Sequence, residues 1–428
     1  MSRKRQKAAK RSANGGISVC FAAAKRGAED KALEKDRQKK KQKKWVRKRH
    51  AAVFAFLRFA MAPFLWLRYH YRAEKAPIRK GPCIVLSNHQ ASMDPFFISK
   101  AFPFQLYFYA SDDLFNLKVS PLIRYLAAPI PKSKSVADLK AVMISLRVLR
   151  EGGAIGITPE GNRTLSGRLW EMSDAVAKLV KTAKVPLVLF NLCGGYGTDP
   201  RWGVKIRRGT KFVGRVRRIL PPEEYADMTE EELFGIIKAE LDVDDTASGE
   251  RYKSRHRAEF IERALYMCPV CGSIGTIHSH GTKFCCTSCK TEAEYTEDLK
   301  ISPPVAGYSR IYEWFEWERR EVVQRVLGGE KISDGGILFR ESVKMQKKIK
   351  LPGDTVTLDK DALTIAGDGK EMRYPLSEID AVTAVGKKKF NFYYKGKILQ
   401  VKGDRRFCSI KYVHAFDGLR AARKEEVQ

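Results

Sequence analysis

The stretch Ser87-Asn88-His89-Gln90-Ala91-Ser92-Met93-Asp94-Pro95 follows a short apolar run, Cys83-Ile84-Val85-Leu86, which begins after a Gly-Pro pair. A four-residue, β-rich run after such a break predicts a buried strand. His89 then belongs to the loop at the carboxyl end of that strand, where open α/β sheets bind their ligands. This stretch therefore predicts both an α/β fold and the position of its chemistry.

Asp94 follows His89 at a spacing that a regular helix does not bring together. The step between them would turn a helix by about 500°, which leaves the two side chains about 140° apart. Pro95 disfavours helical geometry at Asp94, so we expect an irregular turn, then a helix with Asp94 as its N-cap. Such a turn can bring the carboxylate against one imidazole nitrogen, so that the other nitrogen accepts a proton from a hydroxyl. The competing interpretation is that Asp94 only caps a helix and His89 is an ordinary loop histidine.

A second motif, Thr158-Pro159-Glu160-Gly161-Asn162-Arg163-Thr164, also follows an apolar run, residues 152–157. It too is predicted to leave the carboxyl end of a buried strand, so the two loops can share one crevice. Arg163 offers a forked, permanently charged donor that suits a phosphate or carboxylate. Gly161 lets the backbone approach a ligand closely.

Together these motifs resemble those of the glycerolipid acyltransferase family, typified by the 1-acylglycerol-3-phosphate acyltransferases. The family's Asn-His-x4-Asp motif corresponds to Asn88, His89 and Asp94, and its Phe-Pro-Glu-Gly-Thr-Arg-Ser motif to residues 158–164. A block with a valine-proline pair corresponds to residues 185–190. The remaining block is approximated by residues 128–132, with a lysine in place of the usual arginine.

The resemblance implies that an acyl group passes from an acyl thioester, carried by CoA or acyl carrier protein, to a lysolipid. The expected acceptor is the sn-2 hydroxyl of 1-acylglycerol 3-phosphate (lysophosphatidic acid), which gives phosphatidic acid in phospholipid biosynthesis; another lysolipid acceptor is the alternative. His89 would be the catalytic base and Asp94 would orient it, without a catalytic cofactor. The residues expected to bind the acceptor are Glu160, Gly161, Asn162, Arg163, Lys132 and Lys134.

Two cysteine pairs, Cys268-x-x-Cys271 and Cys286-x-x-Cys289, stand fourteen residues apart. Each pair can present both sulfurs to one tetrahedral ion, so we predict a zinc ribbon with four thiolate ligands. Four protein ligands leave no open coordination position, which makes the expected Zn²⁺ structural. Cys285 could compete as a ligand only by breaking the spacing. The remaining cysteines are scattered, which favours a reducing compartment.

The net charge of +31 and the pI near 9.8 predict an anionic partner. Residues 1–50 carry 19 Lys or Arg against four acidic residues, so we expect a disordered arm that attracts anionic membrane lipids. The apolar segment 51–67 is interrupted by Arg58 and Pro63 and is shorter than the roughly 20 residues that a spanning helix needs. We therefore expect a monotopic hairpin or interfacial helix on the cytoplasmic face of the cell membrane, with a buried core helix as the alternative.

Beyond residue 336 short alternating runs separated by turn signals predict an antiparallel β meander with a helix near 411–424. Its layout resembles a pleckstrin-homology-like domain, which implies headgroup binding or protein docking. The predicted fold class is an α/β, glycerol-3-phosphate acyltransferase-like layered domain with a mostly parallel sheet, followed by a zinc ribbon and a small antiparallel β domain. The predicted segments are a basic arm (1–50), a membrane-interfacial helix (51–72), the acyltransferase domain (73–242), a linker (243–266), the zinc ribbon (267–300), a helical linker (301–335) and a small β domain with a C-terminal helix (336–428).

A rival function is a non-catalytic zinc-ribbon adaptor that uses its basic arm on nucleic acid or an anionic membrane. Zinc ribbons often bind nucleic acid, and a charge of +31 favours such a partner. However, neither the ribbon nor its flanks interleave aromatic and basic residues as a base-stacking surface would. Nucleic acid is therefore not the partner that we expect.

Overall fold

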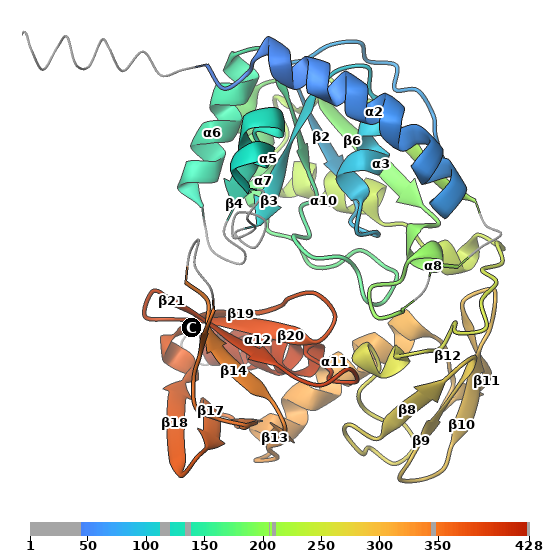
Figure 1. Cartoon of the computed structure of the whole chain (residues 1–428), viewed down its shortest axis with the longest axis vertical. Coiled ribbons are helices and arrows are strands. Elements are labelled where there is room, and N and C mark those ends of the chain that lie inside the picture. The colour runs from blue at the N-terminus through green and yellow to red at the C-terminus, as the bar shows by residue number, and fades with distance from the viewer. Residues whose placement is uncertain are drawn as a thin grey trace, which may run out of the picture. The chain divides into compact units, whose positions relative to one another are not determined.

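The sheet that carries the two motifs is mostly parallel, as predicted (Figure 1). Its strand order is β1-β7-β6-β2-β5-β3-β4. Strand β2 is parallel to both β5 and β6, and β3 is parallel to β5 and β4, whereas β7 runs antiparallel to β6. The strands are β1 (Tyr71–Ala73), β2 (Cys83–Ser87), β3 (Leu106–Ser111), β4 (Ile130–Lys132), β5 (Ala154–Ile157), β6 (Leu187–Cys193) and β7 (Phe212–Leu220).

The computed structural model describes residues 44–111, 120–132, 138–204, 206–207, 211–343 and 348–425. The chain divides into two units, Met1–Trp45 and Val46–Gln428, and the elements described here belong to the second. Most of the basic arm expected for residues 1–50 lies outside the described residues, and so does Lys134. Every residue of β2 and β5 is buried, which explains why both strands are continuous apolar runs.

Helices follow the strands in alternation, as expected of a layered α/β domain. They are α3 (Asp94–Ala101), α5 (Ser120–Ala127), α6 (Leu139–Arg150), α7 (Ala175–Ala183), α8 (Gly195–Thr198), α9 (Pro222–Tyr225) and α10 (Glu230–Leu241). The Thr229 capping box that predicts the start of α10 is present. The N-cap expected at Asp94 is wrong: Met93 is the N-cap of α3, and the Asp94 carboxylate accepts bonds from the preceding loop instead.

Helix α2 (Lys48–Tyr69) runs without a break through Pro63, so the predicted hairpin is wrong. Pro63 removes one backbone hydrogen-bond donor from the helix. The helix nevertheless continues past Pro63, and it packs against α3 and α5. By length and composition α2 could cross a membrane. Only 17% of its most apolar 18-residue segment is buried against the rest of the chain. Its large exposed apolar side chains include Phe56, Phe59, Trp66 and Leu67.

The segment expected to be a linker, 243–266, is packed against its neighbours. It contains the short 3-10 helices η1 (Asp245–Ala247) and η2 (Ile261–Arg263), and Tyr252 is fully buried. An antiparallel sheet of the expected ribbon follows, with β8 (Ile277–His280), β9 (Lys283–Cys286), β10 (Glu292–Tyr295), β11 (Lys300–Val305) and β12 (Tyr308–Arg310). Helix α11 (Ile311–Leu327) then leads to the C-terminal β domain.

The C-terminal β domain consists of two antiparallel sheets and the expected last helix, α12 (Ile410–Glu425). The first sheet holds β13 (Ile332–Asp334), β16 (Thr355–Leu358), β17 (Ala362–Gly367) and β18 (Lys370–Pro375). The second holds β14 (Leu338–Glu341), β15 (Ile349–Lys350), β19 (Ile379–Ala384), β20 (Lys389–Tyr394) and β21 (Lys397–Lys402), and the short 3-10 helix η3 (Leu376–Glu378) precedes β19.

The ribbon and the C-terminal β domain share one hydrophobic core, which includes Cys268 and Phe390. Leu165, Tyr196 and Trp202 of the α/β part also belong to it. The mostly parallel sheet has a separate core of its own, which includes Phe97 and Phe190.

The exposed rings of α2 predict a test of membrane attachment. Replacing Phe59 and Trp66 together by Ser removes apolar area from the exposed face of the helix, where their side chains are 82% and 54% accessible. We expect the double variant to sediment poorly with anionic vesicles while its thermal unfolding is unchanged, because neither ring is in the core. Ile349→Ser, which exposes a polar group at a 50% accessible site of the β domain, is the control. Equal vesicle binding by wild type and double variant would contradict the role of α2.

Candidate active site

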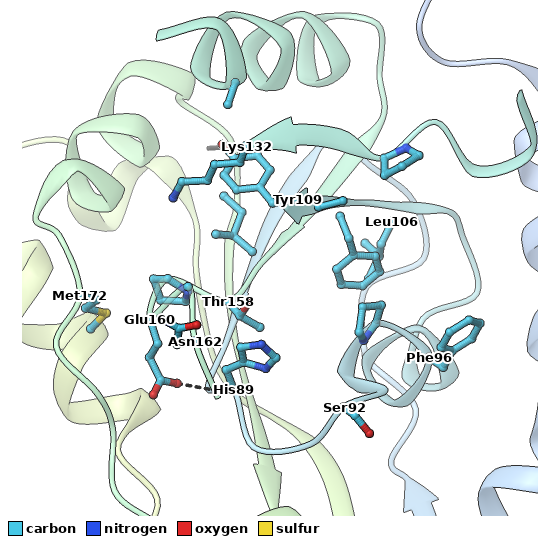
Figure 2. A pocket seen from close by; sticks show the side chains of 18 of the residues that line it. His89, Ser92, Phe96, Leu106, Tyr109, Lys132, Thr158, Glu160, Asn162 and Met172 are labelled. Carbon is cyan, nitrogen blue, oxygen red and sulfur yellow. Dashed lines mark hydrogen bonds between the residues drawn. The ribbon is translucent and has the colours of Figure 1, made fainter. Parts of the chain in front are cut away.

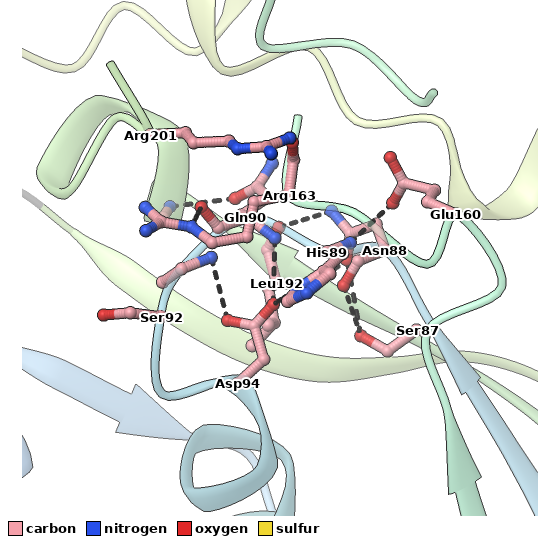
Figure 3. Close-up of polar contacts among 12 residues, drawn as sticks. Ser87, Asn88, His89, Gln90, Ser92, Asp94, Glu160, Arg163, Leu192 and Arg201 are labelled. Carbon is pink, nitrogen blue, oxygen red and sulfur yellow. Dashed lines mark hydrogen bonds and ion pairs between the residues drawn. The ribbon is translucent and has the colours of Figure 1, made fainter. Parts of the chain in front are cut away.

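His89 lies on the loop after β2, and its ring is held by Asp94 (Figure 3). The distance from His89 Nδ1 to Asp94 Oδ2 is 2.7 Å. Asp94 is completely buried, and its carboxylate also accepts the backbone N–H groups of Gln90 and Ala91, each at 2.9 Å. The carboxylate thus fixes the loop and leaves His89 Nε2 as the ring nitrogen that is free to exchange a proton. The sequence predicted this contact between imidazole and carboxylate.

Glu160 joins the loop after β5 to the histidine loop. Its Oε1 accepts the backbone N–H of His89 at 2.6 Å, and its Oε2 accepts the backbone N–H of Trp170 at 2.7 Å. Burial raises the pKa of Glu160 to about 8, against the opposing effect of these two donors. Both oxygens of Glu160 therefore position backbone, and its contact with substrate stays a prediction.

Two further side chains of the first motif fix the histidine loop to β6 and α8. The amide of Asn88 pairs with the backbone of Leu192, donating to its carbonyl at 2.9 Å and accepting from its N–H at 2.8 Å. Gln90 Oε1 accepts the N–H of Gly195 at 2.9 Å. Gln90 was not predicted to have a role, and its place beside His89 was the signal that could have found it.

Arg163 holds the loops together and does not line the cavity in front of His89. Its Nε donates to the Gln90 carbonyl at 3.2 Å, and its Nη2 donates to the Asp199 carbonyl and lies 3.3 Å from the Asp199 carboxylate. Its guanidinium therefore joins the loop after β5 to the backbone at Gln90 and at Asp199. Arg201, which sequence reasoning missed, donates to the Arg163 carbonyl from a buried position.

A cavity of about 1270 Å³ opens in front of His89 (Figure 2). It is lined by three of the residues that the sequence singled out in the second motif, Glu160, Gly161 and Asn162, and by Lys132 of β4. The apolar lining comes from α2, β3 and α5 and includes Phe54, Leu57, Leu106, Phe108, Ile123 and Leu126. The structure thus brings an apolar space and a proton acceptor together.

Lys132 is a cation within this lining, with its Nζ 5.4 Å from the centre of the Tyr109 ring. Burial lowers the pKa of Lys132, and Asp138 partly opposes that effect. Burial removes the water that stabilises the positive charge of the ammonium. An anion that binds beside the ammonium stabilises this charge again, so its binding is favoured. Lys132 is therefore better placed than Arg163 to meet an anionic group in the cavity.

The four cysteines of the expected ribbon converge on one point. Their sulfurs all lie within 4.8 Å of one another, and the Cys268–Cys289 and Cys271–Cys286 Sγ distances are both 3.7 Å. Four sulfurs that each lie about 2.3 Å from one tetrahedral ion are about 3.8 Å apart, so the geometry fits Zn²⁺. His278 and His280 lie on exposed positions of β8, as expected for residues that are not ligands.

Zinc content tests this cluster. We expect about one zinc ion per purified chain, and Cys286→Ser to lose most of it and unfold at lower temperature, because a structural metal contributes directly to folding. Elemental analysis and thermal unfolding measure the two effects. Cys285→Ser is the neighbouring control and should keep its zinc, since Cys285 is not among the converging ligands. Equal zinc in both variants would rule the site out.

The pH dependence of stability tests the burial of Glu160. Its pKa in the folded chain, about 8, exceeds the ordinary value of 4.5, so the unfolded chain ionises first as the pH rises. We expect the stability that Glu160 contributes to be full below pH 4.5 and to fall as the pH rises toward 8. Chemical unfolding of wild type and Glu160→Gln across this range measures the difference. A difference that stays constant with pH would contradict a raised pKa.

Comparisons with known proteins agree with this geometry. The family model described as "Acyltransferase" matches residues 68–190. A probable 1-acyl-sn-glycerol-3-phosphate acyltransferase of Mycoplasma genitalium is 28% identical over 127 residues, which cover 28% of this chain and 47% of the relative. The human 1-acyl-sn-glycerol-3-phosphate acyltransferase beta is 30% identical over 129 residues, which cover 29% of this chain and 46% of the relative.

The chain spans about half the length of these curated relatives. The crystal structure of the 1-acyl-sn-glycerophosphate acyltransferase PlsC from Thermotoga maritima is 21% identical, covers 44% of this chain and 75% of its own, and has a TM-score of 0.37. The matched residues contain both motifs and the loops that they build. Residues 68–190 therefore match the acyltransferase family model, and this part of the chain is similar to the 1-acyl-sn-glycerol-3-phosphate acyltransferases.

Proposed function

We propose that this protein transfers a fatty acyl group from an acyl thioester to the sn-2 hydroxyl of lysophosphatidic acid and so forms phosphatidic acid at a membrane. The observation that carries the proposal is the histidine held by a buried carboxylate at the wall of a large, partly apolar cavity. The similar proteins of Mycoplasma genitalium and human are 1-acyl-sn-glycerol-3-phosphate acyltransferases, which supports lysophosphatidic acid as the acceptor.

In this mechanism His89 Nε2 removes the proton of the acceptor hydroxyl as the hydroxyl oxygen attacks the thioester carbonyl. Asp94 holds the ring through Nδ1 and stabilises the imidazolium that forms. The tetrahedral intermediate then expels the thiolate, which takes the proton back from the imidazolium. The thioester C–S bond is thus replaced by an ester C–O bond to the acceptor, and no covalent acyl-enzyme is formed.

We assign the acceptor phosphate to Lys132, as the sequence also predicts. Among the described residues, the cations that line the cavity are Arg58, Lys100, Lys132 and Arg201. Arg201 donates to backbone carbonyls and Arg58 donates to the Phe102 carbonyl, which leaves Lys132 and, as the second candidate, Lys100. Arg163, with its donors directed at Gln90 and Asp199, acts by holding the loops.

The apolar end of the cavity suits an acyl chain, and the exposed face of α2 suits the membrane from which a lysolipid would come. Attachment to the cytoplasmic face through anionic lipids fits the chain's charge of +31. The rival reading, an adaptor without catalysis, leaves both the His89–Asp94 pair and the cavity without a role.

Acyl transfer from acyl-CoA and from acyl carrier protein to lysophosphatidic acid in vesicles tests the proposal. We expect His89→Ala and Asp94→Asn to lose about 100-fold to 10,000-fold in turnover, the usual contribution of a general base, while zinc content stays unchanged. His280→Ala, at an exposed site outside the cavity, is the matched control. Full activity of His89→Ala would rule out the mechanism, and other lysolipids in the same assay would identify a different acceptor.

A further inference from the structure

The cavity has a second end, which the C-terminal β domain builds. Strand β19 contributes Val382, Thr383 and Ala384, and α12 contributes Val413 and Asp417. On the acyltransferase side this end meets the segment after the second motif, residues 170–173. With about 1270 Å³ the cavity exceeds the roughly 300–1000 Å³ of a typical small-molecule site, so it has room for more than an acyl chain.

Two contacts hold this end against the catalytic loops. Buried Arg201 donates from Nη2 to the Ala384 carbonyl at 3.0 Å and from Nε to the Gly386 carbonyl at 3.2 Å, while Nη1 donates to the Arg163 carbonyl at 2.9 Å. The Trp170 ring stacks on His414 of α12, with ring centres 5.7 Å apart and planes 10° from parallel. The β domain is thereby fastened to the residues that position His89.

The lining of this end is mostly apolar, with a few polar side chains among which carboxylates outnumber free cations. Glu171 and Asp417 are its carboxylates, and its cation, Arg201, is committed to three carbonyls. Thr383 is 2% exposed, and its buried hydroxyl has no hydrogen-bond partner among the described residues. A buried polar group without a partner is costly, and a ligand that hydrogen-bonds it would remove that cost.

The two carboxylates disfavour a phosphate, and the apolar walls with one unpaired hydroxyl favour a neutral chain that is partly apolar and carries a few hydrogen-bonding groups. The cations suited to the acceptor phosphate line other parts of the cavity, which leaves this end for the donor. An acyl thioester donor has a segment of this kind between its sulfur and its phosphate, the pantetheine arm, both in CoA and on a carrier protein.

We propose that the C-terminal β domain is part of the donor site and that the end lined by Thr383 binds the pantetheine arm. This inference rests on the proposed acyl transfer. It gives the β domain a direct contact with substrate and makes Thr383 a residue that distinguishes long thioester donors from short ones.

The test compares Thr383→Val with wild type, as full chains, on three donors: acyl-CoA, acyl carrier protein, and the acyl thioester of N-acetylcysteamine, which lacks the distal amide and hydroxyl of the arm. Valine keeps the shape and removes the hydroxyl. We expect KM for CoA and carrier donors to rise about fivefold, the effect of one neutral hydrogen bond, and KM for the short donor to stay within about twofold. The donor with saturable turnover in wild type identifies the source of the arm.

Thermal unfolding separates this role from damage to the fold. Removing an unpaired buried hydroxyl should leave the midpoint unchanged or raise it. Thr364→Val, on β17 and outside the cavity, is the matched control and should leave all donor KM values unchanged. An unchanged donor KM in Thr383→Val, or an equal rise with the short donor, would overturn this inference alone. Failure of wild type to use any thioester would overturn the proposed function itself.

Discussion

The carboxylate of Glu160 is the constraint on which the site depends. It accepts one backbone N–H from the histidine loop and one from Trp170, so a single buried group sets the distance between two loops that leave neighbouring parallel strands. Burial disfavours the ionised form of Glu160, and its two donors oppose that effect only in part. Each oxygen has a donor only when both loops are in place.

Polar side chains do the same elsewhere around the site. Asn88 completes the backbone pairing at Leu192, Gln90 reaches α8, and Asp245 accepts the N–H of Gly194 at 2.7 Å from a segment that the sequence left as a linker. Loops have few regular hydrogen bonds of their own, so buried polar side chains supply them. The precision of the His89 position comes from this network rather than from the strand alone.

Features that depend on residues close together in the sequence could be predicted, and features that depend on distant residues could not. The buried strands β2 and β5, the capping box at Thr229 and the cysteine pairs are written in adjacent residues, and all are present. The contact of His89 with Asp94 was predictable because five residues and a proline restrict the turn. The orientation of Arg163 was not, because its partner Asp199 is distant in sequence.

Strands β18 and β19 were missed for a related reason. Half of β18 is exposed and charged, so it has little apolar surface to mark it as a strand, and β19 is buried along most of its length and lacks a regular alternation. The structure places β19 against the catalytic cavity, a relation that no local pattern encodes.

The contact of the β domain with the cavity and the stack of Trp170 on His414 have a consequence for how the protein is made. The ribosome releases the chain from its N-terminus, and domains generally fold in that order as they emerge. Here the loop that holds Glu160 emerges long before α12, the helix on which Trp170 rests. The nascent α/β part would have an open flank at its cavity until α12 is synthesised, so the cavity would be completed late in translation, after α2 has already emerged.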